Sequence, residues 1–267
     1  MFKKIFLILL LNLISIEFVA AQNCDYEEYY KNIEFARKEY ANDNFKEASK
    51  LYKIAFESTD FPFGTDLCIA FKVAQKTKDE IWMEQIAIQL AKGGVPLKYF
   101  KFFTKYKWSK KFYTQFPQYE KYFNENFDLE FRKTLVDVAK LDKETNNRFH
   151  DWRTRKEAHS VDTLVAEMTN VSLGFQKMIE KFGFPTEQKI GYYYNKGDVN
   201  ELPTFVLFTH IYQRGELLYK ERLTELACKG SLTQFQSKQL ENIRGLGNST
   251  GIVQEMKARE KKYRKNE

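Results

Sequence analysis

Apolar residues in the first third of this chain recur at intervals of three and four, the spacing of one face of an α-helix. Two such runs occupy the segments 26–40 and 45–57, and a polar stretch at 41–44 separates them. The apolar positions are Tyr29, Ile33, Ala36 and Tyr40, then Phe45, Ala48, Tyr52 and Ala55. The pattern predicts a helical hairpin in which alanines permit close approach and aromatic rings fill the remaining space.

A second, weaker hairpin is predicted directly afterwards. Its helices cover 67–76 and 81–92, with a turn at 77–79 and Gly93-Gly94 at the end. Glycine commonly follows the last turn of a helix, so the second helix is expected to end there.

These two hairpins resemble the tetratricopeptide repeat, a helix-turn-helix unit of about 34 residues. The resemblance covers residues 26–94, and the sequence departs from the repeat at Asn32 and Asp43. It implies a protein-binding groove, with Phe45 and Tyr52 as its structural support. The alternative is that the hairpins only buttress the second half of the chain.

The segment 97–127 is crowded with aromatic residues and interleaved lysines. Such a mixture can stack on a glycan or on single-stranded nucleic acid. The helical spacing of Tyr99, Phe102, Phe103 and Tyr106 instead favours a buried face, with lysines on the wet face. Pro117 is expected to divide this segment into two short helices.

Five further helices are predicted in the back half, at 129–149, 161–182, 201–213, 216–228 and 233–243. Gly183 and Pro185 should stop the second of them. The intervening segment 186–199 is expected to be a loop, with 192–194 as a candidate edge strand. The predicted fold class is therefore all-α, with degenerate tetratricopeptide-like helical hairpins packed on a C-terminal helical domain.

The back half also resembles an uncharacterised bacterial domain family of unknown function, over residues 129–245. The matching features, in order, are Asp142 with Arg148, Asn170, the segment 179–185 ending in Gly-Phe-Pro, Ile190-Gly191, and His210. The sequence departs from the family at Thr209, where a glutamine is usual, and has only Glu241 and Arg244 for a later acidic–arginine pair. The resemblance implies an architecture and candidate positions, without a reaction.

Residues 1–21 have the pattern of a secretory signal peptide: Lys3-Lys4, an apolar stretch, and small residues at 19–21. The stretch is too short for a comfortable transmembrane span, and no later segment has the required apolar length. We expect an exported protein, periplasmic or extracellular. The predicted parts are thus residues 1–21 (signal peptide), 22–127 (repeat-like), 128–245 (helical domain) and 246–267 (basic tail).

Three cysteines, Cys24, Cys68 and Cys228, leave at least one thiol unpaired in a monomer. Export permits a disulfide. A bond between Cys24 and Cys68 would join the first two helical units, and the alternative is three buried or half-buried thiols. The absence of a C-x-x-C motif argues against a redox pair or a zinc knuckle.

The formal net charge is +7, and much of the excess comes from six basic residues in 257–267. This tail is expected to be a solvated helix end, with weak attraction to anionic lipid or polysaccharide as the alternative. The chain has no signature of a nucleic-acid-binding fold, so we expect no nucleic-acid partner.

His210 is the best single candidate for chemistry. On a helix it shares a face with Val206 and Leu207 before it and with Gln213 and Arg214 after it, so one edge is apolar and the other polar. A histidine in this setting is commonly a hydrogen-bonded core residue.

A catalytic role for His210 requires partners. Asp142 or Glu144 are candidates to orient the ring, and Arg148 is a candidate to bind an anion. His150, His159 and His210 form no metal-binding signature, and no G-x-S-x-G nucleophile motif occurs. We therefore predict no metal and no cofactor.

The sequence favours a non-enzymatic exported helical protein that binds another protein or a cell-envelope component through its front half. The alternative is a hydrolase-like enzyme with a site around His210, Asp142 and Arg148.

Overall fold

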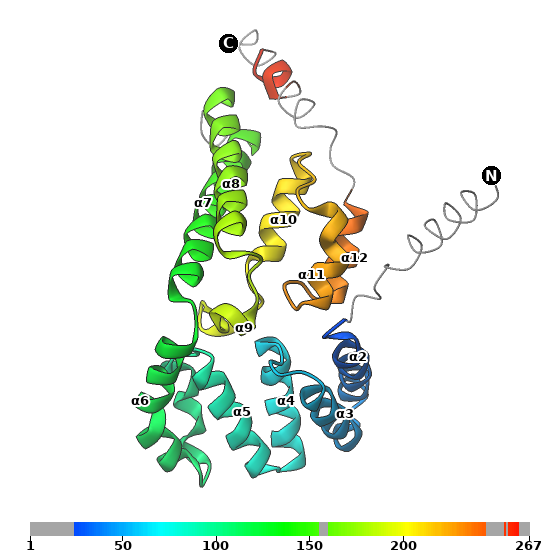
Figure 1. Ribbon diagram of the computed structural model, residues 1–267, viewed down its shortest axis with the longest axis vertical. Coiled ribbons are helices and arrows are strands. Elements are labelled where there is room, and N and C mark those ends of the chain that lie inside the picture. The colour runs from blue at the N-terminus through cyan, green and yellow to red at the C-terminus, as the bar shows by residue number, and fades with distance from the viewer. Residues whose placement is uncertain (1–23, 155–159, 244–253, 255, 262–267) are drawn as a thin grey trace, which may run out of the picture.

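The computed structural model describes residues 24–154, 160–243, 254 and 256–261. The described chain is almost entirely helical, with one two-stranded hairpin, so the predicted all-α class is confirmed. Figure 1 shows two groups of helices, α2 to α6 below and α7 to α12 above. The predicted signal peptide, the glycine-rich link at 245–251 and most of the basic tail lie outside the described residues.

The front half begins with two packed helical hairpins, as predicted. Their helices are α2 (Glu27–Ala41), α3 (Phe45–Glu57), α4 (Gly64–Thr77) and α5 (Glu80–Lys92). The turn between α4 and α5 places Lys78 in the left-handed region at φ 59°, and the Asp79 side chain accepts a hydrogen bond from Trp82 N to start α5.

The aromatic segment forms a 3₁₀ helix, η1 (Leu97–Lys105), and then α6 (Ser109–Asn126). Its buried rings are Phe100, Trp108, Phe112, Phe116 and Tyr119, and four more pack against the core while partly buried. The predicted buried face is wrong at Phe102, which is 83% exposed. The expected break at Pro117 is wrong, because α6 continues through this residue. The burial of Phe112, Phe116 and Tyr119 on one face offsets the single backbone hydrogen bond that proline cannot donate.

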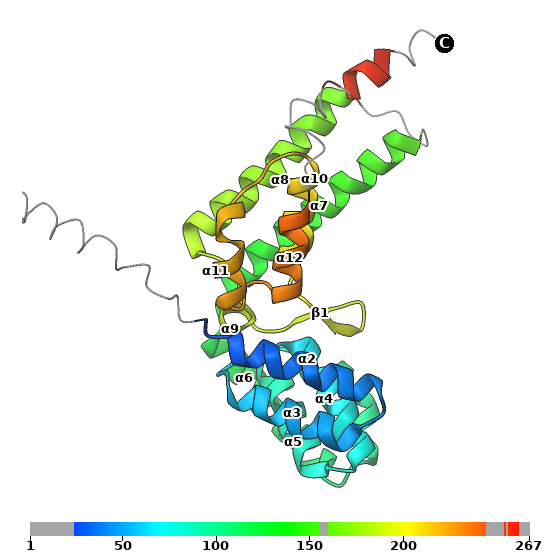
Figure 2. The same ribbon diagram turned by 90° about the vertical axis from the view of Figure 1, so that its right-hand side faces the viewer.

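The back half contains two long antiparallel helices, a small junction and a cluster of shorter helices (Figure 2). The elements are α7 (Leu129–Thr154), α8 (Val161–Phe182), α9 (Glu187–Ile190), β1 (Tyr193–Asn195), β2 (Asp198–Asn200), α10 (Thr204–Gln213), η2 (Lys220–Arg222), α11 (Leu223–Cys228) and α12 (Gln234–Asn242). The predicted helix over 161–182 is confirmed with the same bounds. The expectation of one helix over 216–228 is wrong, since only η2 and α11 form there.

The junction between the halves is built around Tyr192, which belongs to the core of the front half although it lies in the back half of the sequence. Its ring fills the space over Gly64 and Gly93, and its hydroxyl donates to the Pro62 carbonyl over 3.2 Å. Arg132 of α7 donates to the Tyr192 carbonyl over 2.8 Å. The segment 186–199, which was predicted to be a loop, instead contains the short helix α9 and the hairpin of β1 and β2.

A disulfide joins Cys24, just before α2, to Cys228 at the end of α11. The expected alternatives, a Cys24–Cys68 bond or three thiols, are both wrong. Cys68 lies on α4, where its sulfur contacts the Tyr99 hydroxyl at 3.2 Å, and burial raises the pKa of its thiol to about 11. Among the described helices, none combines the length and apolar character that crossing a bilayer requires.

Candidate functional site

Two helices of the back half face each other with a pair of polar residues on each. Asp142 and Asn146 lie on α7, and His210 and Arg214 lie on α10 and at its end. Both pairs are four residues apart, so each pair occupies one helix face. The packing of α7 against α10 thus brings four polar side chains from two short segments into one cluster.

Asp142 is the centre of this cluster and is 2% exposed. Its Oδ1 accepts a hydrogen bond from Arg214 Nη2 over 2.8 Å, and its Oδ2 accepts one from His210 Nδ1 over 2.5 Å. Asn146 Nδ2 donates to the same Oδ2 over 3.3 Å and also contacts the His210 ring. A buried carboxylate with this many donors meets the requirement that a buried charge be paired and hydrogen-bonded.

Arg214 completes the cluster by binding the carboxylate oxygen of Asp142 that His210 does not contact. Its side chain is 8% exposed, and Nη2 also donates to Asn146 Oδ1 over 3.2 Å. Its Nη1 is buried and has no hydrogen-bond partner among the described residues. The guanidinium therefore supplies a fixed positive charge against Asp142 and holds the Asn146 amide with its nitrogen toward Asp142 Oδ2.

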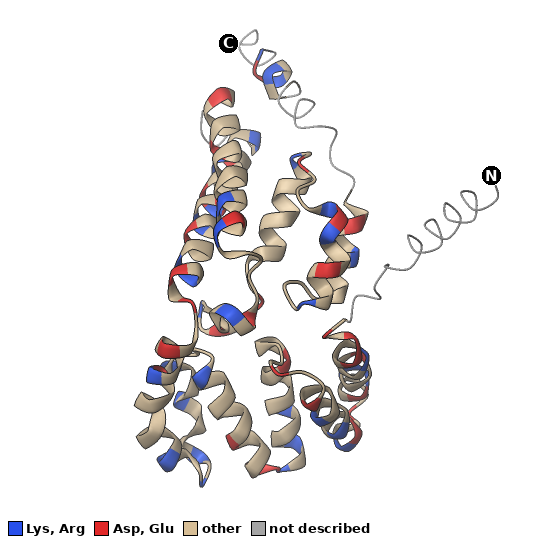
Figure 3. Ribbon diagram, in the orientation of Figure 1, with Lys and Arg blue, Asp and Glu red and all other residues tan. Residues whose placement is uncertain are grey.

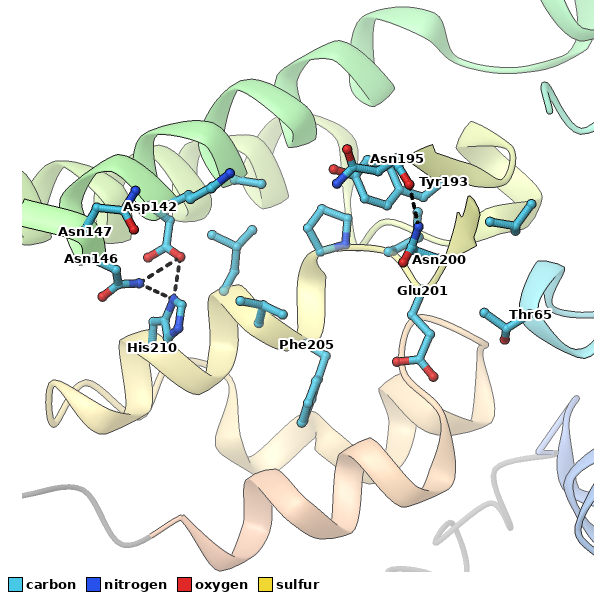
Figure 4. A pocket seen from close by; sticks show the side chains of 17 residues that line it. Thr65, Asp142, Asn146, Asn147, Tyr193, Asn195, Asn200, Glu201, Phe205 and His210 are labelled. Atoms are coloured by element: carbon cyan, nitrogen blue, oxygen red, sulfur yellow. Dashed lines mark hydrogen bonds and ion pairs between the residues drawn. The ribbon is translucent and has the colours of Figure 1, made fainter. Parts of the chain in front are cut away.

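The His210 side chain is 28% exposed, whereas those of Asp142 and Arg214 are buried. Because the Asp142 carboxylate only accepts hydrogen bonds, the neutral imidazole carries its proton on Nδ1. This tautomer leaves the lone pair on Nε2, which no described residue bonds. Figure 4 shows Nε2 on the edge of the ring away from Asp142.

The cluster lies at one end of a cavity of about 610 Å³, a size within the usual range for small-molecule sites. Figure 4 shows its walls: α7 on one side, α10 on another, and the hairpin with Glu201 toward the front half. Among the described residues that line it, the hydroxyl groups belong to Thr65 and Tyr193. Both lie away from His210, so among the described lining residues no hydroxyl or thiol group is placed beside the imidazole.

The structure brings two of the three predicted candidates together. His210 and Asp142 are paired, but Arg148 instead forms an ion pair with Glu167 of α8 at 2.8 Å. Arg148 is six residues beyond Asp142, and at about 100° per residue this places it on a different face of α7. Glu144, two residues beyond Asp142, is exposed and does not orient His210.

Asn146 and Arg214 were not predicted as members of the site. The sequence indicates Arg214 only as a polar neighbour of His210 on its helix face. The signal that identifies both residues is their spacing of four from the candidate residues Asp142 and His210, which is local and visible in the sequence.

The residues predicted to support a front-half groove are packed inside the hairpins. Tyr52 is fully buried, and Phe45 is partly buried with its ring 5.9 Å from that of Tyr40. A separate cavity of about 380 Å³ lies between α2, α4 and α12. It is therefore shared between the front half and the back half.

The contact between the front half and the back half, which we call the seam, contains a buried acid, Glu187 of α9. Its Oε2 accepts a hydrogen bond from Gly64 N over 2.8 Å. Removal from water raises the pKa of Glu187 to about 8, and the hydrogen bond from Gly64 only partly opposes this effect. The packing of α9 against α4 is thus coupled to pH.

Charged residues are spread over both halves, and α10 carries none (Figure 3). Among the described residues, no group of three or more histidine, cysteine, aspartate or glutamate side chains is placed to hold a metal ion. His150 is exposed on α7, and His159 lies outside the described residues.

Comparison with known proteins found no matching family model, no matching curated protein and no matching solved structure.

Proposed function

We propose that the protein is a hydrolase-like enzyme whose catalytic base is His210. The observation that carries this proposal is the pairing of His210 Nδ1 with the buried Asp142 carboxylate, at 2.5 Å, in the wall of a cavity of about 610 Å³. A histidine that is oriented by a buried carboxylate, with its other nitrogen accessible, has the arrangement required of a general base.

The nucleophile in this proposal is water. His210 Nε2 takes a proton from water as the water oxygen forms a bond to an acyl carbon of the substrate. The imidazolium then returns the proton to the leaving oxygen or nitrogen as that bond breaks. Asp142 remains ionised, supported by Arg214, and stabilises the imidazolium that forms between the two steps.

Two further lining residues suit the charge that develops in this reaction. Lys143 and Asn147 line the same cavity and are exposed on α7. An ammonium and an amide N–H are groups that stabilise a negative acyl oxygen.

The test is a panel of chromogenic esters and amides assayed with the wild-type chain and with His210→Asn. We expect His210→Asn to lower kcat/KM by at least about a hundredfold, the usual scale of general-base catalysis. His150→Asn is the matched control, since His150 is exposed on α7 and is outside the cluster. Activity that survives in His210→Asn, or is absent from the wild type across the panel, would contradict the proposal.

A second candidate function is binding of a protein or cell-envelope component through the front half. Its support is the cavity of about 380 Å³ that α2 and α4, the first helices of the two hairpins, form with α12. In this second candidate function, the two hairpins have a tetratricopeptide-like arrangement that forms the binding surface. The back half would then be a domain that resembles the uncharacterised bacterial family. Pull-down from envelope extract with the wild type and with Glu34→Arg tests it, and equal recovery of every bound component would count against it.

We further propose that the chain is exported after removal of residues 1–21. Expression of the full chain followed by N-terminal sequencing should give a new terminus at Gln22 or a neighbouring residue. An unprocessed chain that remains in the cytoplasmic fraction would contradict this proposal.

A further inference from the structure

The cavity beside His210 and the cavity between α2, α4 and α12 adjoin each other. Glu201 lines both, and the neighbouring residues Thr65 and Asp66 line one each. Their volumes are about 610 and 380 Å³. Together they form two neighbouring hollows of mixed polar and apolar lining between the front and back halves, which suits a ligand of several units more than a single small molecule.

The first hollow is lined by amide groups and apolar surface, together with the charged residues Asp142, Lys143 and Glu201. Four asparagines line it: Asn146, Asn147, Asn195 and Asn200. The rings of Tyr193 and Phe205 line it too, and Val206 is 48% exposed there. Amides supply donors and acceptors for hydroxyl groups, and rings supply flat surfaces for the apolar face of a sugar.

The second hollow has an exposed ring at its edge. Phe235, in the first turn of α12, is 67% exposed and lines this cavity beside Gln234 and Thr233. Figure 4 shows the Phe205 side chain of the first hollow directed toward α12. The two phenylalanines thus provide ring surfaces in adjoining hollows.

The charges of the seam are largely compensated within the protein. Arg37 pairs with Asp66 at 2.7 Å, and Arg214 pairs with Asp142 at 2.8 Å. Of the other charged lining residues, the acids Glu34 and Glu201 are matched in number by the bases Lys143 and Lys238. A polyanion or polycation would require an excess of one sign along its path, which these pairs do not supply.

We propose that the two hollows are neighbouring subsites for an uncharged oligosaccharide, with one end of the chain at His210 and a more distant sugar on the Phe235 ring. The reaction at the His210 end of the oligosaccharide rests on the proposed function. The substrate class is then an acyl-bearing glycan. An acyl group on a sugar hydroxyl supplies the carbon that water attacks, and the sugar hydroxyl is the group that leaves with the returned proton.

Calorimetric titration of the full chain tests the inference. The probes are unacylated hexasaccharides and disaccharides of β-1,4-linked glucose, of β-1,4-linked N-acetylglucosamine and of α-1,4-linked glucose, with an uncharged hexapeptide as the rival ligand. We expect at least one hexasaccharide to bind, and Phe235→Ala to weaken it about tenfold, the scale of one lost ring contact. The matching disaccharide should change by less than about twofold, because it does not need the second hollow.

Phe102→Ala is the matched control, since Phe102 is an 83% exposed phenylalanine of η1 that lines neither hollow. It should leave the hexasaccharide affinity unchanged. The inference is overturned if no hexasaccharide binds, if Phe235→Ala leaves the affinity unchanged, or if the hexapeptide binds as tightly as the best sugar.

The two proposals fail separately. His210-dependent ester hydrolysis without any oligosaccharide binding would overturn the substrate class and leave the enzyme proposal intact. Phe235-dependent binding without His210-dependent hydrolysis would uphold the glycan site and contradict the enzyme.

Discussion

Arg214 donates a hydrogen bond to the carboxylate of Asp142 over 2.8 Å, across 72 residues of sequence, and both side chains are buried. The pair fixes the end of α10 against the middle of α7. It also keeps Asp142 available as the acceptor for His210. Stability and the proposed chemistry therefore depend on the same contact.

Replacing Arg214 separates the buried pair and should be costly. We expect Arg214→Met to lower the free energy of unfolding by about 3–5 kcal/mol, because Asp142 is left as an uncompensated buried charge. Arg148→Met is the matched control: the side chains of its pair with Glu167 are 34% and 25% exposed, and the pair should contribute only about 0–1 kcal/mol. Urea denaturation of both variants measures the difference, and equal losses would contradict the central role of Arg214.

The orientation of His210 is expected to depend on the charge of Asp142. Asp142→Asn should reduce the hydrolysis rate by about 10²–10⁴-fold, because an amide can donate to Nδ1 and so favours the wrong tautomer. Asp137→Asn, on the exposed face of the same helix, should have no effect. Rates are to be compared under conditions in which circular dichroism shows each variant folded, and a near-normal rate in Asp142→Asn would argue against the dyad.

The ring of Tyr192 occupies the space over Gly93. A Cβ atom on Gly93 would lie 2.2 Å from the Tyr192 ring, although the backbone of Gly93 has an ordinary φ of −85°. Gly93→Ala should therefore destabilise the protein by about 1–3 kcal/mol through overpacking.

Gly174 of α8 provides the comparison for this substitution, since its Cβ would meet Val138 only at 3.7 Å. Gly174→Ala should be neutral or stabilising by about 0.5–1 kcal/mol, because alanine favours a helix interior. Thermal unfolding of the two variants measures both effects. If Gly93→Ala unfolds at the wild-type temperature, Tyr192 is not fixed in the way described.

The disulfide between Cys24 and Cys228 closes almost the whole described chain, with a sequence separation of 204. Replacing both cysteines by serine should cost about 2–5 kcal/mol, mainly because the unfolded chain regains conformational freedom. Cys68→Ser leaves the bond in place and separates this effect from the loss of a thiol. Chemical denaturation with and without a reducing agent should reproduce the difference, and insensitivity of the wild type to reduction would contradict it.

The buried Glu187 should make stability depend on pH. Its pKa is about 8 in the folded protein against an ordinary value of 4.5, so the folded state holds a proton that the unfolded state has released between these limits. Stability from this group is complete below pH 4.5 and is lost as the pH rises toward 8 and beyond.

Glu187→Gln keeps an oxygen for the Gly64 N–H and removes the titration. We expect this variant to exceed the wild type in stability at pH 8, with a difference on the order of a few kcal/mol that shrinks toward pH 5. Glu144→Gln, an exposed acid of α7, is the control and should follow the wild-type profile. Parallel pH profiles for Glu187→Gln and the wild type would show that Glu187 is solvated.

Helices are the part of the structure that local pattern predicted best. The helix over 161–182 has the predicted bounds because its apolar spacing and its Gly183 stop are properties of neighbouring residues. The expected break at Pro117 was wrong because packing of the rings around it outweighs one missing backbone hydrogen bond. Propensity is a weak guide where burial on one face is large.

The candidate site was predicted in part. His210 stood out by its place between apolar and polar neighbours, and Asp142 was among its candidate partners. The choice of Arg214 over Arg148 follows from the faces of two helices and from how those helices meet. The helix face on which each residue lies can be read from residue spacing, but the way in which the two helices meet cannot.

The sequence by itself determined the all-α class and most helix positions, and it indicated His210 as a candidate residue. Only the tertiary structure decided that Cys24 bonds Cys228, that Tyr192 joins the front core, and that Asp142 receives both His210 and Arg214. The physical reason is range: helical periodicity acts over three or four residues, whereas these contacts join side chains 68 or more residues apart through the packing of whole helices.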